Sequence, residues 1–154
     1  MGKEIEKKFL VKGTNWKNLA EGIVYRQAYL STKKENVVRV RIVGDKGYLT
    51  VKGLNLGVSR LEYEYEIPII DAKEILNNLC KKPIIEKKRY KIKFEGLMWE
   101  VDEFLGKNKG LIIAEVELSY ETQEIKKPVW IGREVTSESK FFNSNLVSNP
   151  YSKW

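Results

Sequence analysis

The strongest pattern along the chain is an alternation of apolar and polar side chains with a period of two, which is typical of β-strands that bury one face. In one segment Val38, Val40 and Ile42 oppose Arg39 and Arg41. Similar segments are separated by turn signals at hairpin spacing, which predicts antiparallel neighbours. The segments predicted as strands are 3–11, 22–32, 36–43, 47–54, 59–67, 84–95, 97–105 and 111–121.

Helical spacing is confined to short segments. Residues 71–80 carry an apolar stripe, with Asp71 as the candidate N-cap, and shorter helices are expected near 14–20 and 137–147. The sequence contains no composition shift or repeat that marks a domain boundary, so we expect one domain over 1–154. The predicted fold class is α+β, mainly β: an eight-stranded antiparallel closed β-barrel with a few flanking helices.

The polar faces of these strands carry charges of one sign per strand. An ordinary solvated face mixes signs and uncharged polar residues, whereas here residues at i and i+2 present two like charges side by side. The acidic pairs are Glu4 and Glu6, Glu62 and Glu64, Glu100 and Asp102, and Glu115 and Glu117, and the basic residues are Lys8, Arg39, Arg41, Lys52, Lys87 and Arg89.

Paired like charges on a strand are unfavourable unless an opposite charge lies between them. Carboxylates from several strands can coordinate a hard divalent cation, and Arg and Lys can hold phosphate oxygens. A site with both halves suits a polyanion that carries a metal ion. In a barrel, this pattern predicts a charged lumen and an apolar outer face that helices or neighbours cover.

Composition narrows the chemistry further. The chain has no histidine, which excludes imidazole bases and histidine-ligated zinc and leaves oxygen ligands that favour Mg²⁺ or Mn²⁺. Its net charge of +7 favours an anionic partner. A single cysteine, Cys80, excludes an intrachain disulfide and fits a reducing cytoplasm. No apolar run approaches the length that spans a membrane, so no membrane partner is expected.

Two other interpretations of the charged faces stay open. Each pair alone is typical of a solvated strand edge, and only their joint occurrence argues against that explanation. A nucleic-acid-binding barrel is the stronger rival, because basic charge and aromatic residues suit single-strand binding. However, the acidic residues on the same face would repel a phosphate backbone, and Tyr63, Tyr65 and Trp99 fall on the apolar side, where core packing is expected. Nucleic acid is therefore not the expected partner.

The ordered set of motifs resembles the CYTH superfamily, also called triphosphate tunnel metalloenzymes, over nearly the whole chain. The segment Glu4-Ile5-Glu6-Lys7-Lys8 fits the family's N-terminal Glu-x-Glu-x-Lys signature. Further segments similar to the family follow in its order, namely Val38-Arg39-Val40-Arg41, Leu49-Thr50-Val51-Lys52-Gly53, Arg60-Leu61-Glu62-Tyr63-Glu64, Lys87-Lys88-Arg89, Trp99-Glu100-Val101-Asp102-Glu103-Phe104, Ala114-Glu115-Val116-Glu117-Leu118, Trp130-Ile131-Gly132-Arg133-Glu134-Val135-Thr136 and Phe142-Asn143.

The resemblance implies a tunnel that binds a linear triphosphate and hydrolyses its terminal phosphoanhydride with Mg²⁺ or Mn²⁺. The metal and water ligands that it implies are Glu4, Glu6, Asp102, Glu115 and Glu117, to which their shared strand face adds Glu62 and Glu64. The phosphate-binding residues that it implies are Lys8, Arg39, Arg41, Lys52, Lys87 and Arg89, to which we add Arg60. The candidate catalytic residues are Glu4, Glu6, Lys8 and Glu117, with one of the three carboxylates as proton acceptor.

The expected substrate is inorganic tripolyphosphate, cleaved to pyrophosphate and phosphate, because the short chain without histidine or base-binding elements resembles the family's compact bacterial branch. The alternatives are a nucleoside or thiamine triphosphatase, a class IV adenylate cyclase, and a module that binds polyphosphate or RNA without catalysis. A homodimer through apolar strand faces is a further expectation.

Overall fold

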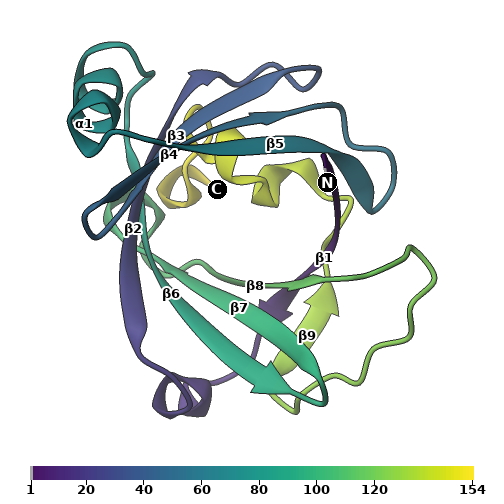
Figure 1. Ribbon diagram of the computed structural model, residues 1–154. Helices are drawn as coiled ribbons and strands as arrows, with labels where there is room; N and C mark the ends of the chain where they lie inside the picture. Colours follow the sequence, from purple (N-terminus) through teal and green to yellow (C-terminus); the bar gives the residue numbers. More distant parts are fainter. Residues whose placement is uncertain (1) are drawn as a thin grey trace.

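The computed structural model describes residues 2–154 and contains one β-sheet that closes on itself (Figure 1). The strands are β1 (Lys3–Val11), β2 (Gly22–Ser31), β3 (Val37–Val43), β4 (Lys46–Lys52), β5 (Ser59–Ile67), β6 (Ile85–Phe94), β7 (Leu97–Phe104), β8 (Ile112–Glu117) and β9 (Ile131–Glu134). The helical elements are α1 (Ile69–Asn78) and the short 3₁₀ turns η1 (Asn15–Asn18), η2 (Gly106–Asn108), η3 (Ser139–Phe141), η4 (Asn143–Leu146) and η5 (Tyr151–Lys153).

The barrel closes through β1, which pairs with three strands. Its first residues pair with β5, where Lys3 lies opposite Leu61, and its next residues pair with β8, where Glu6 lies opposite Glu117. The strands therefore follow one another around a ring in the order β5, β4, β3, β2, β6, β7, β8, β1 and back to β5. The prediction of an eight-stranded antiparallel closed barrel is confirmed. The short β9, which was not predicted, pairs with the end of β1 outside this ring.

The ring order places two pairs of strands on opposite walls. Four steps along the ring separate β1 from β2, and four separate β8 from β3. In a ring of eight strands, these pairs face one another across the lumen. The acidic residues of β1 and β8 thus lie on the wall opposite the basic residues of β3.

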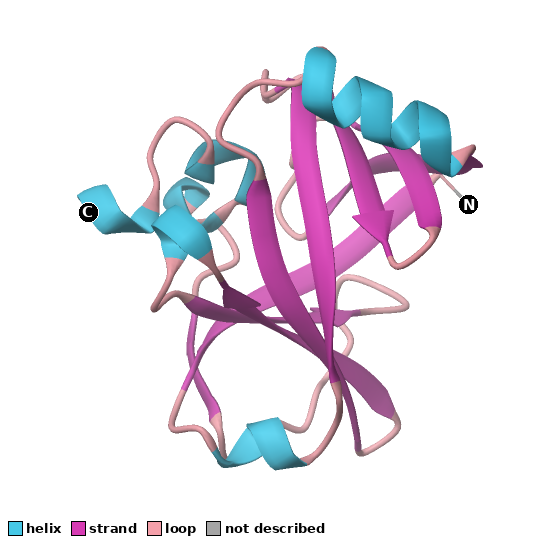
Figure 2. Cartoon of the chain, turned by 90° about the vertical axis from the view of Figure 1, so that its left-hand side faces the viewer, coloured by secondary structure: helices cyan, strands magenta, loops and turns pink. Residues whose placement is uncertain are grey.

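Helix α1 covers the outer face of β2, β3 and β4, as Figure 2 shows (top). Ala72 and Leu76 of the helix pack on Ala28, Val40 and Ile42, and all five are buried. Gly47 in β4 permits this approach, since a Cβ there would lie 2.4 Å from the Cβ of Ala72. The outward parity of these strand residues is the one that the sequence predicts.

A second apolar cluster lies on the outer face of the opposite side of the barrel. Trp16 in η1 packs edge-on against Tyr90, and Trp99 packs against Phe9 and Trp130. The side chains of Trp16, Trp99 and Phe9 are fully buried. The prediction that Trp99 belongs to the core is confirmed. The turn η1 and the segment before β9 therefore cover this face as α1 covers the other.

The C-terminal segment packs against a third apolar cluster. Phe141 and Leu146 pack with Tyr29, Val37 and Phe104. Tyr29 and Val37 also line the interior cavity. In Figure 1 this segment lies across the barrel opening. The sequence predicted a charged lumen. The structure shows that apolar side chains line the part of the lumen next to the C-terminal segment.

The outer face of β5 is the exception to this coverage. The side chains of Tyr63 and Tyr65 are 47% and 60% exposed, and Leu61 and Val51 beside them are also exposed. The expectation that both tyrosines pack in the core was wrong. They have the apolar parity, but no segment of residues 2–154 folds over them. The predicted homodimer stays a prediction.

Helix boundaries also differ from those predicted. Helix α1 begins at Ile69 with Pro68 in the N-cap position, and Asp71 lies in its first turn instead of capping it. The segment 137–147 forms the separate 3₁₀ turns η3 and η4 where one helix was expected. None of the helices described in residues 2–154 has the length and apolar character that a membrane span requires.

Candidate active site

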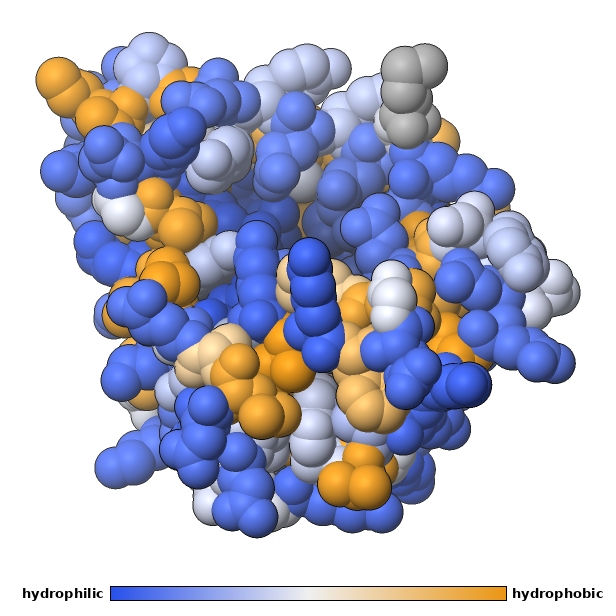
Figure 3. Space-filling model, turned by 60° about the horizontal axis from the view of Figure 1, so that its bottom comes forward, coloured by the Kyte–Doolittle hydropathy of each residue, from blue (hydrophilic) through white to orange (hydrophobic). Residues whose placement is uncertain are grey.

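A cavity of about 480 Å³ occupies the interior of the barrel. Figure 3 shows a recess surrounded mainly by hydrophilic side chains. Every predicted site residue except Asp102 lines the cavity. The acidic side chains of its wall are Glu4, Glu6, Glu62, Glu64, Glu100, Glu115 and Glu117, and the basic ones are Lys8, Arg39, Arg41, Lys52, Arg60, Lys87, Arg89 and Lys91.

Lys8 lies between two carboxylates on the wall formed by β1 and β8. Its Nζ is 3.1 Å from Glu6 Oε1 and 3.1 Å from Glu115 Oε1. Burial, followed by the charge of Glu115, raises the pKa of Glu6 to about 7. Burial also opposes ionisation of Glu115, but Lys8, Arg89 and Lys87 outweigh it and hold the pKa of that carboxyl well below its ordinary range. This wall therefore holds more negative charge than Lys8 can neutralise.

A second ion-pair cluster joins β1, β4 and β5 where the barrel closes. Lys52 Nζ lies 3.2 Å from Glu4 Oε2 and 3.0 Å from Glu62 Oε2, and Arg60 Nε lies 3.4 Å from Glu4 Oε1. Burial would raise the pKa of Glu62, but contacts with Glu4 and Lys52 lower it overall. The two carboxylates and two cations of this cluster bring predicted metal ligands and predicted phosphate-binding residues into direct contact.

Arg39 is buried and bonded to β4 and β5. Its Nη2 donates to Thr50 Oγ1 at 3.1 Å and to Glu64 Oε1 at 3.3 Å, and the Thr50 hydroxyl donates to the same Glu64 oxygen at 2.7 Å. Burial raises the pKa of Glu64, but these hydrogen bonds and the Arg39 charge lower it overall. Thr50 thus fixes the geometry of an Arg–carboxylate pair that the sequence alone did not identify.

Asp102 lies behind the cavity wall and holds two of its cations. Its Oδ2 accepts from Lys87 Nζ at 2.7 Å and from Arg89 Nη2 at 2.8 Å, while Oδ1 accepts from Arg89 Nε at 2.7 Å. The side chain is fully buried and does not line the cavity. Burial opposes its ionisation, yet Arg89 and Lys87 lower its pKa overall. The structure therefore places Asp102 as a counter-ion of the basic residues.

Arg41 differs from the other predicted phosphate-binding residues because no carboxylate within residues 2–154 forms an ion pair with it. Its Nε donates to Gln27 Oε1 at 3.1 Å, and its guanidinium lies 5.1 Å from the ring centre of Tyr25. Burial lowers the pKa of Arg41 to about 10, and the charges of Arg39 and Arg89 add to this effect. The guanidinium keeps its charge at neutral pH and turns to the cavity without a protein counter-ion.

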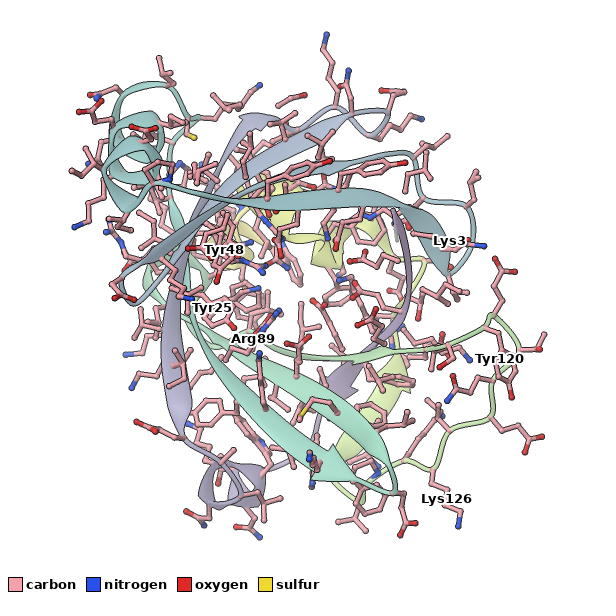
Figure 4. All side chains as sticks on the ribbon, viewed as in Figure 1. Lys3, Tyr25, Tyr48, Arg89, Tyr120 and Lys126 are labelled. Carbon is pink, nitrogen blue, oxygen red and sulfur yellow. The ribbon has the colours of Figure 1, made fainter. Side chains whose placement is uncertain are left out.

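Two polar residues of the site escaped the sequence reasoning as functional candidates. Gln27 is fully buried on β2, and Asn143 Oδ1 accepts from Lys87 Nζ at 2.8 Å and from Gln27 Nε2 at 3.1 Å. Gln27 shares the inward parity of Tyr25, and a polar residue at such a position is the signal that could have identified it. Figure 4 shows Tyr25, Tyr48 and Arg89 turned to the barrel interior, whereas Lys3, Tyr120 and Lys126 point outwards.

The donor set of the cavity fits a hard divalent cation, because its candidate ligands are carboxylates. Glu6 and Glu115 share Lys8 as a partner, and Glu4 and Glu62 share Lys52. Glu117 lies opposite Glu6 in the strand register and forms no ion pair with residues 2–154. However, no three acidic side chains of the described residues are clustered as a preformed metal site. A cation would therefore recruit pairs of carboxylates that now contact lysines.

The closed antiparallel barrel and its charged interior cavity define the class of protein. Residues 2–149 match the CYTH domain. The chain belongs to the CYTH domain family.

Two curated relatives cover almost the whole chain. The chain is 64% identical, over 98% of its length and 97% of the relative, to an inorganic triphosphatase of Acetivibrio thermocellus. It is 35% identical, over 94% of its length and 96% of the relative, to an inorganic triphosphatase of Nitrosomonas europaea. A crystal structure of an inorganic triphosphatase superposes with a TM-score of 0.67 at 30% identity, covering 94% of this chain and 97% of the other.

Proposed function

We propose that this protein hydrolyses the terminal phosphoanhydride of inorganic tripolyphosphate, giving pyrophosphate and phosphate, with Mg²⁺ or Mn²⁺ as cofactor. Membership of the CYTH domain family and 64% identity to an inorganic triphosphatase support this activity. The observation that carries the proposal is the cavity itself, where carboxylates and cations meet around one enclosed volume. Such a site is suited to a metal-complexed polyanion.

The basic residues would bind the phosphates. Arg41 is available without a protein counter-ion, and Arg39 and Arg89 are held in place by Glu64 and Asp102. Fixed guanidinium groups can stabilise the charge on the equatorial oxygens of the transferred phosphoryl group without reorganising. Lys8 and Lys52, now paired with carboxylates, would gain phosphate contacts as those carboxylates turn to the metal.

The acidic residues would hold the metal and the attacking water. Glu4, Glu6, Glu115 and Glu117 come from the neighbouring strands β1 and β8 and line one wall. A bound divalent cation would supply charge neutralisation and activation of water there. Glu4, Glu6 and Glu117 are the candidate proton acceptors, because each carries a carboxylate at the cavity surface.

The direct test is phosphate release from tripolyphosphate, ATP and thiamine triphosphate after chelation and after addition of Mg²⁺ or Mn²⁺. We expect tripolyphosphate to be cleaved fastest and only when metal is present. Lys52→Ala should reduce the rate, while Lys126→Ala, a matched change of an exposed lysine that points away from the barrel, should not. Cyclic AMP as the main product from ATP, or binding of tripolyphosphate without any turnover, would contradict the proposal.

A further inference from the structure

We propose that Gln27 is a positioning residue for substrate binding: it orients Arg41 by a hydrogen bond and, because its amide is neutral, leaves the Arg41 charge free for a phosphate group of the substrate. This inference rests on the proposed function, since it assumes that an inorganic triphosphate occupies the cavity. Gln27 itself lies behind the cavity-lining residues and is fully buried.

The hydrogen bonds of Gln27 determine which way its amide points. Nε2 donates to Tyr29 Oη at 2.9 Å and to Asn143 Oδ1 at 3.1 Å. Asn143 Oδ1 is also the acceptor for Lys87 Nζ, so only the amide nitrogen of Gln27 can face it. The amide oxygen of Gln27 must then face the Arg41 Nε at 3.1 Å. The orientation of Arg41 is therefore fixed by a network that extends to the C-terminal segment.

The strand register gives a direct comparison within the same cavity. Arg89 on β6 lies opposite Asp102 on β7, and Arg41 on β3 lies opposite Gln27 on β2. In both pairs the partner accepts a hydrogen bond from the arginine Nε. Asp102 also neutralises its arginine, whereas Gln27 offers the same kind of contact without the negative charge. Asp102 accepts two short hydrogen bonds from Arg89, at 2.7 and 2.8 Å, whereas Gln27 accepts one from Arg41 at 3.1 Å. The two positions therefore hold both arginines at Nε but leave them with different net charge.

Tyr25 reinforces the arrangement from the cavity side. Its ring centre lies 5.1 Å from the Arg41 guanidinium carbon and 5.0 Å from that of Arg89. The face of an aromatic ring can attract a guanidinium without neutralising its charge. Gln27 and Tyr25 therefore restrain Arg41 with uncharged groups alone. Restraint of this kind lowers the ordering cost when an anion binds.

A carboxylate in place of the amide would compete with the phosphate for Arg41. Gln27→Glu keeps the shape of the side chain and an acceptor for Arg41, adds a negative charge, and removes the two hydrogen bonds that Nε2 donates to Tyr29 and Asn143. Gln27→Met keeps the approximate volume and removes the hydrogen bonds. Arg41→Ala removes the residue through which we propose that Gln27→Glu and Gln27→Met act. It is therefore the reference against which their effects on KM are compared.

The experiment measures KM and kcat for Mg²⁺-tripolyphosphate, with thermal melting of each variant. We expect Arg41→Ala, Gln27→Met and Gln27→Glu each to raise KM by about tenfold or more, and kcat to change less, because a charge-assisted contact to bound substrate is weakened. In the Arg41→Ala background, neither Gln27 change should raise KM further. Gln123→Met, in the segment before β9, is the matched control and should leave KM unchanged.

Each outcome decides a separate point. An unchanged KM in Arg41→Ala would overturn the proposed function of that residue. If Arg41→Ala raises KM but Gln27→Glu does not, the neutral charge of Gln27 is irrelevant and the inference is wrong. The inference is also wrong if the Gln27 changes raise KM in the Arg41→Ala background by as much as they do in the parent. Gln27 would then act through the C-terminal segment and not through Arg41. Should Gln27→Met fail to fold, Gln27→Glu still decides, since it alters charge at constant shape.

Discussion

The wall formed by β1 and β8 and the wall formed by β2 and β3 contribute charges of opposite sign to the cavity. The first carries Glu4, Glu6, Glu115 and Glu117 against Lys8 alone. The second carries Arg39 and Arg41, and neither β2 nor β3 contributes a carboxylate to the cavity. Strands β1 and β8 therefore contribute an excess of carboxylates to one side of the lumen, and β2 and β3 contribute only cations to the other.

This difference would let one small cavity hold the proposed metal ion and polyanion together. Several carboxylates are paired with a cation in the register, as Glu115 is with Lys8. Glu117 and Arg41, by contrast, form no ion pair within residues 2–154, and each keeps a charge that can attract a ligand. Burial, followed by the charge of Glu115, raises the pKa of Glu6 to about 7. Burial, followed by the charges of Arg39 and Arg89, lowers the pKa of Arg41 to about 10. A bound cation would stabilise the charged form of Glu6, and a bound anion would stabilise the charged form of Arg41.

The largest expected effect comes from Asp102, which neutralises buried cations without lining the cavity. Asp102→Ala leaves the buried Lys87 without an ion pair in residues 2–154 and leaves Arg89 with Glu100 and Glu115 only. This change should lower the free energy of unfolding by about 3–5 kcal/mol. Urea unfolding measures this loss. The matched change Glu124→Ala, at an exposed loop position, should have almost no effect. A loss for Asp102→Ala as small as that of the control would mean that the basic residues do not depend on their counter-ion.

Glu117 should matter for turnover more than for stability. It is exposed to the cavity and forms no ion pair within the described part of the chain, so Glu117→Gln removes a proposed metal or water ligand and little else. We expect kcat for tripolyphosphate to fall about 100-fold or more while binding persists, because the lost contact acts mainly in the transition state. Single-turnover kinetics and equilibrium binding separate the two. Full activity in this variant with metal supplied would remove Glu117 from the site.

Glu6 should make the metal-free protein less stable as the pH rises. Between about pH 4.5 and pH 7, the folded state keeps a proton on Glu6 that the unfolded chain has released, since its pKa is raised from 4.5 to about 7. The contribution of Glu6 to the free energy of unfolding therefore decreases with pH across this window and is lowest above pH 7. Glu6→Gln should remove this dependence and stabilise the metal-free protein at pH 8 by at most about 3 kcal/mol. Melting temperatures at pH 5 and pH 8 in a chelating buffer provide the measurement. A Glu6→Gln variant that melts at a lower temperature than its parent at pH 8 would contradict the crowding of carboxylates on the wall of β1 and β8.

The smallest effect is expected outside the barrel, on the uncovered face of β5. Tyr65→Ser should change the free energy of unfolding by no more than about 0.5 kcal/mol, because the ring is 60% exposed. Trp99→Ala, at the same parity on the covered face, should cost about 3–5 kcal/mol. Denaturant unfolding of both variants measures how much the covering segments contribute. A large loss for Tyr65→Ser at high protein concentration that disappears on dilution would instead point to a second copy on this face.

Strand parity determined which face of the sheet each charged side chain occupies. Because successive residues of a strand point to opposite faces, Glu4, Glu6 and Lys8 had to lie together, and Arg39 and Arg41 likewise. The alternation and the hairpin spacing also predicted an antiparallel barrel with an apolar outer face. These properties are local, so they can be predicted from neighbours in sequence.

Only the tertiary structure decided what each charge contacts and which apolar residues are covered. Tyr63 and Trp99 have the same parity, yet one is 47% exposed and the other fully buried, because coverage depends on where η1 and the later loops fold. Register across strands placed Asp102 beside Arg89 and neutral Gln27 beside Arg41. Pairing between distant strands sets these contacts, and a residue's own sequence neighbours carry no record of its partner across the sheet.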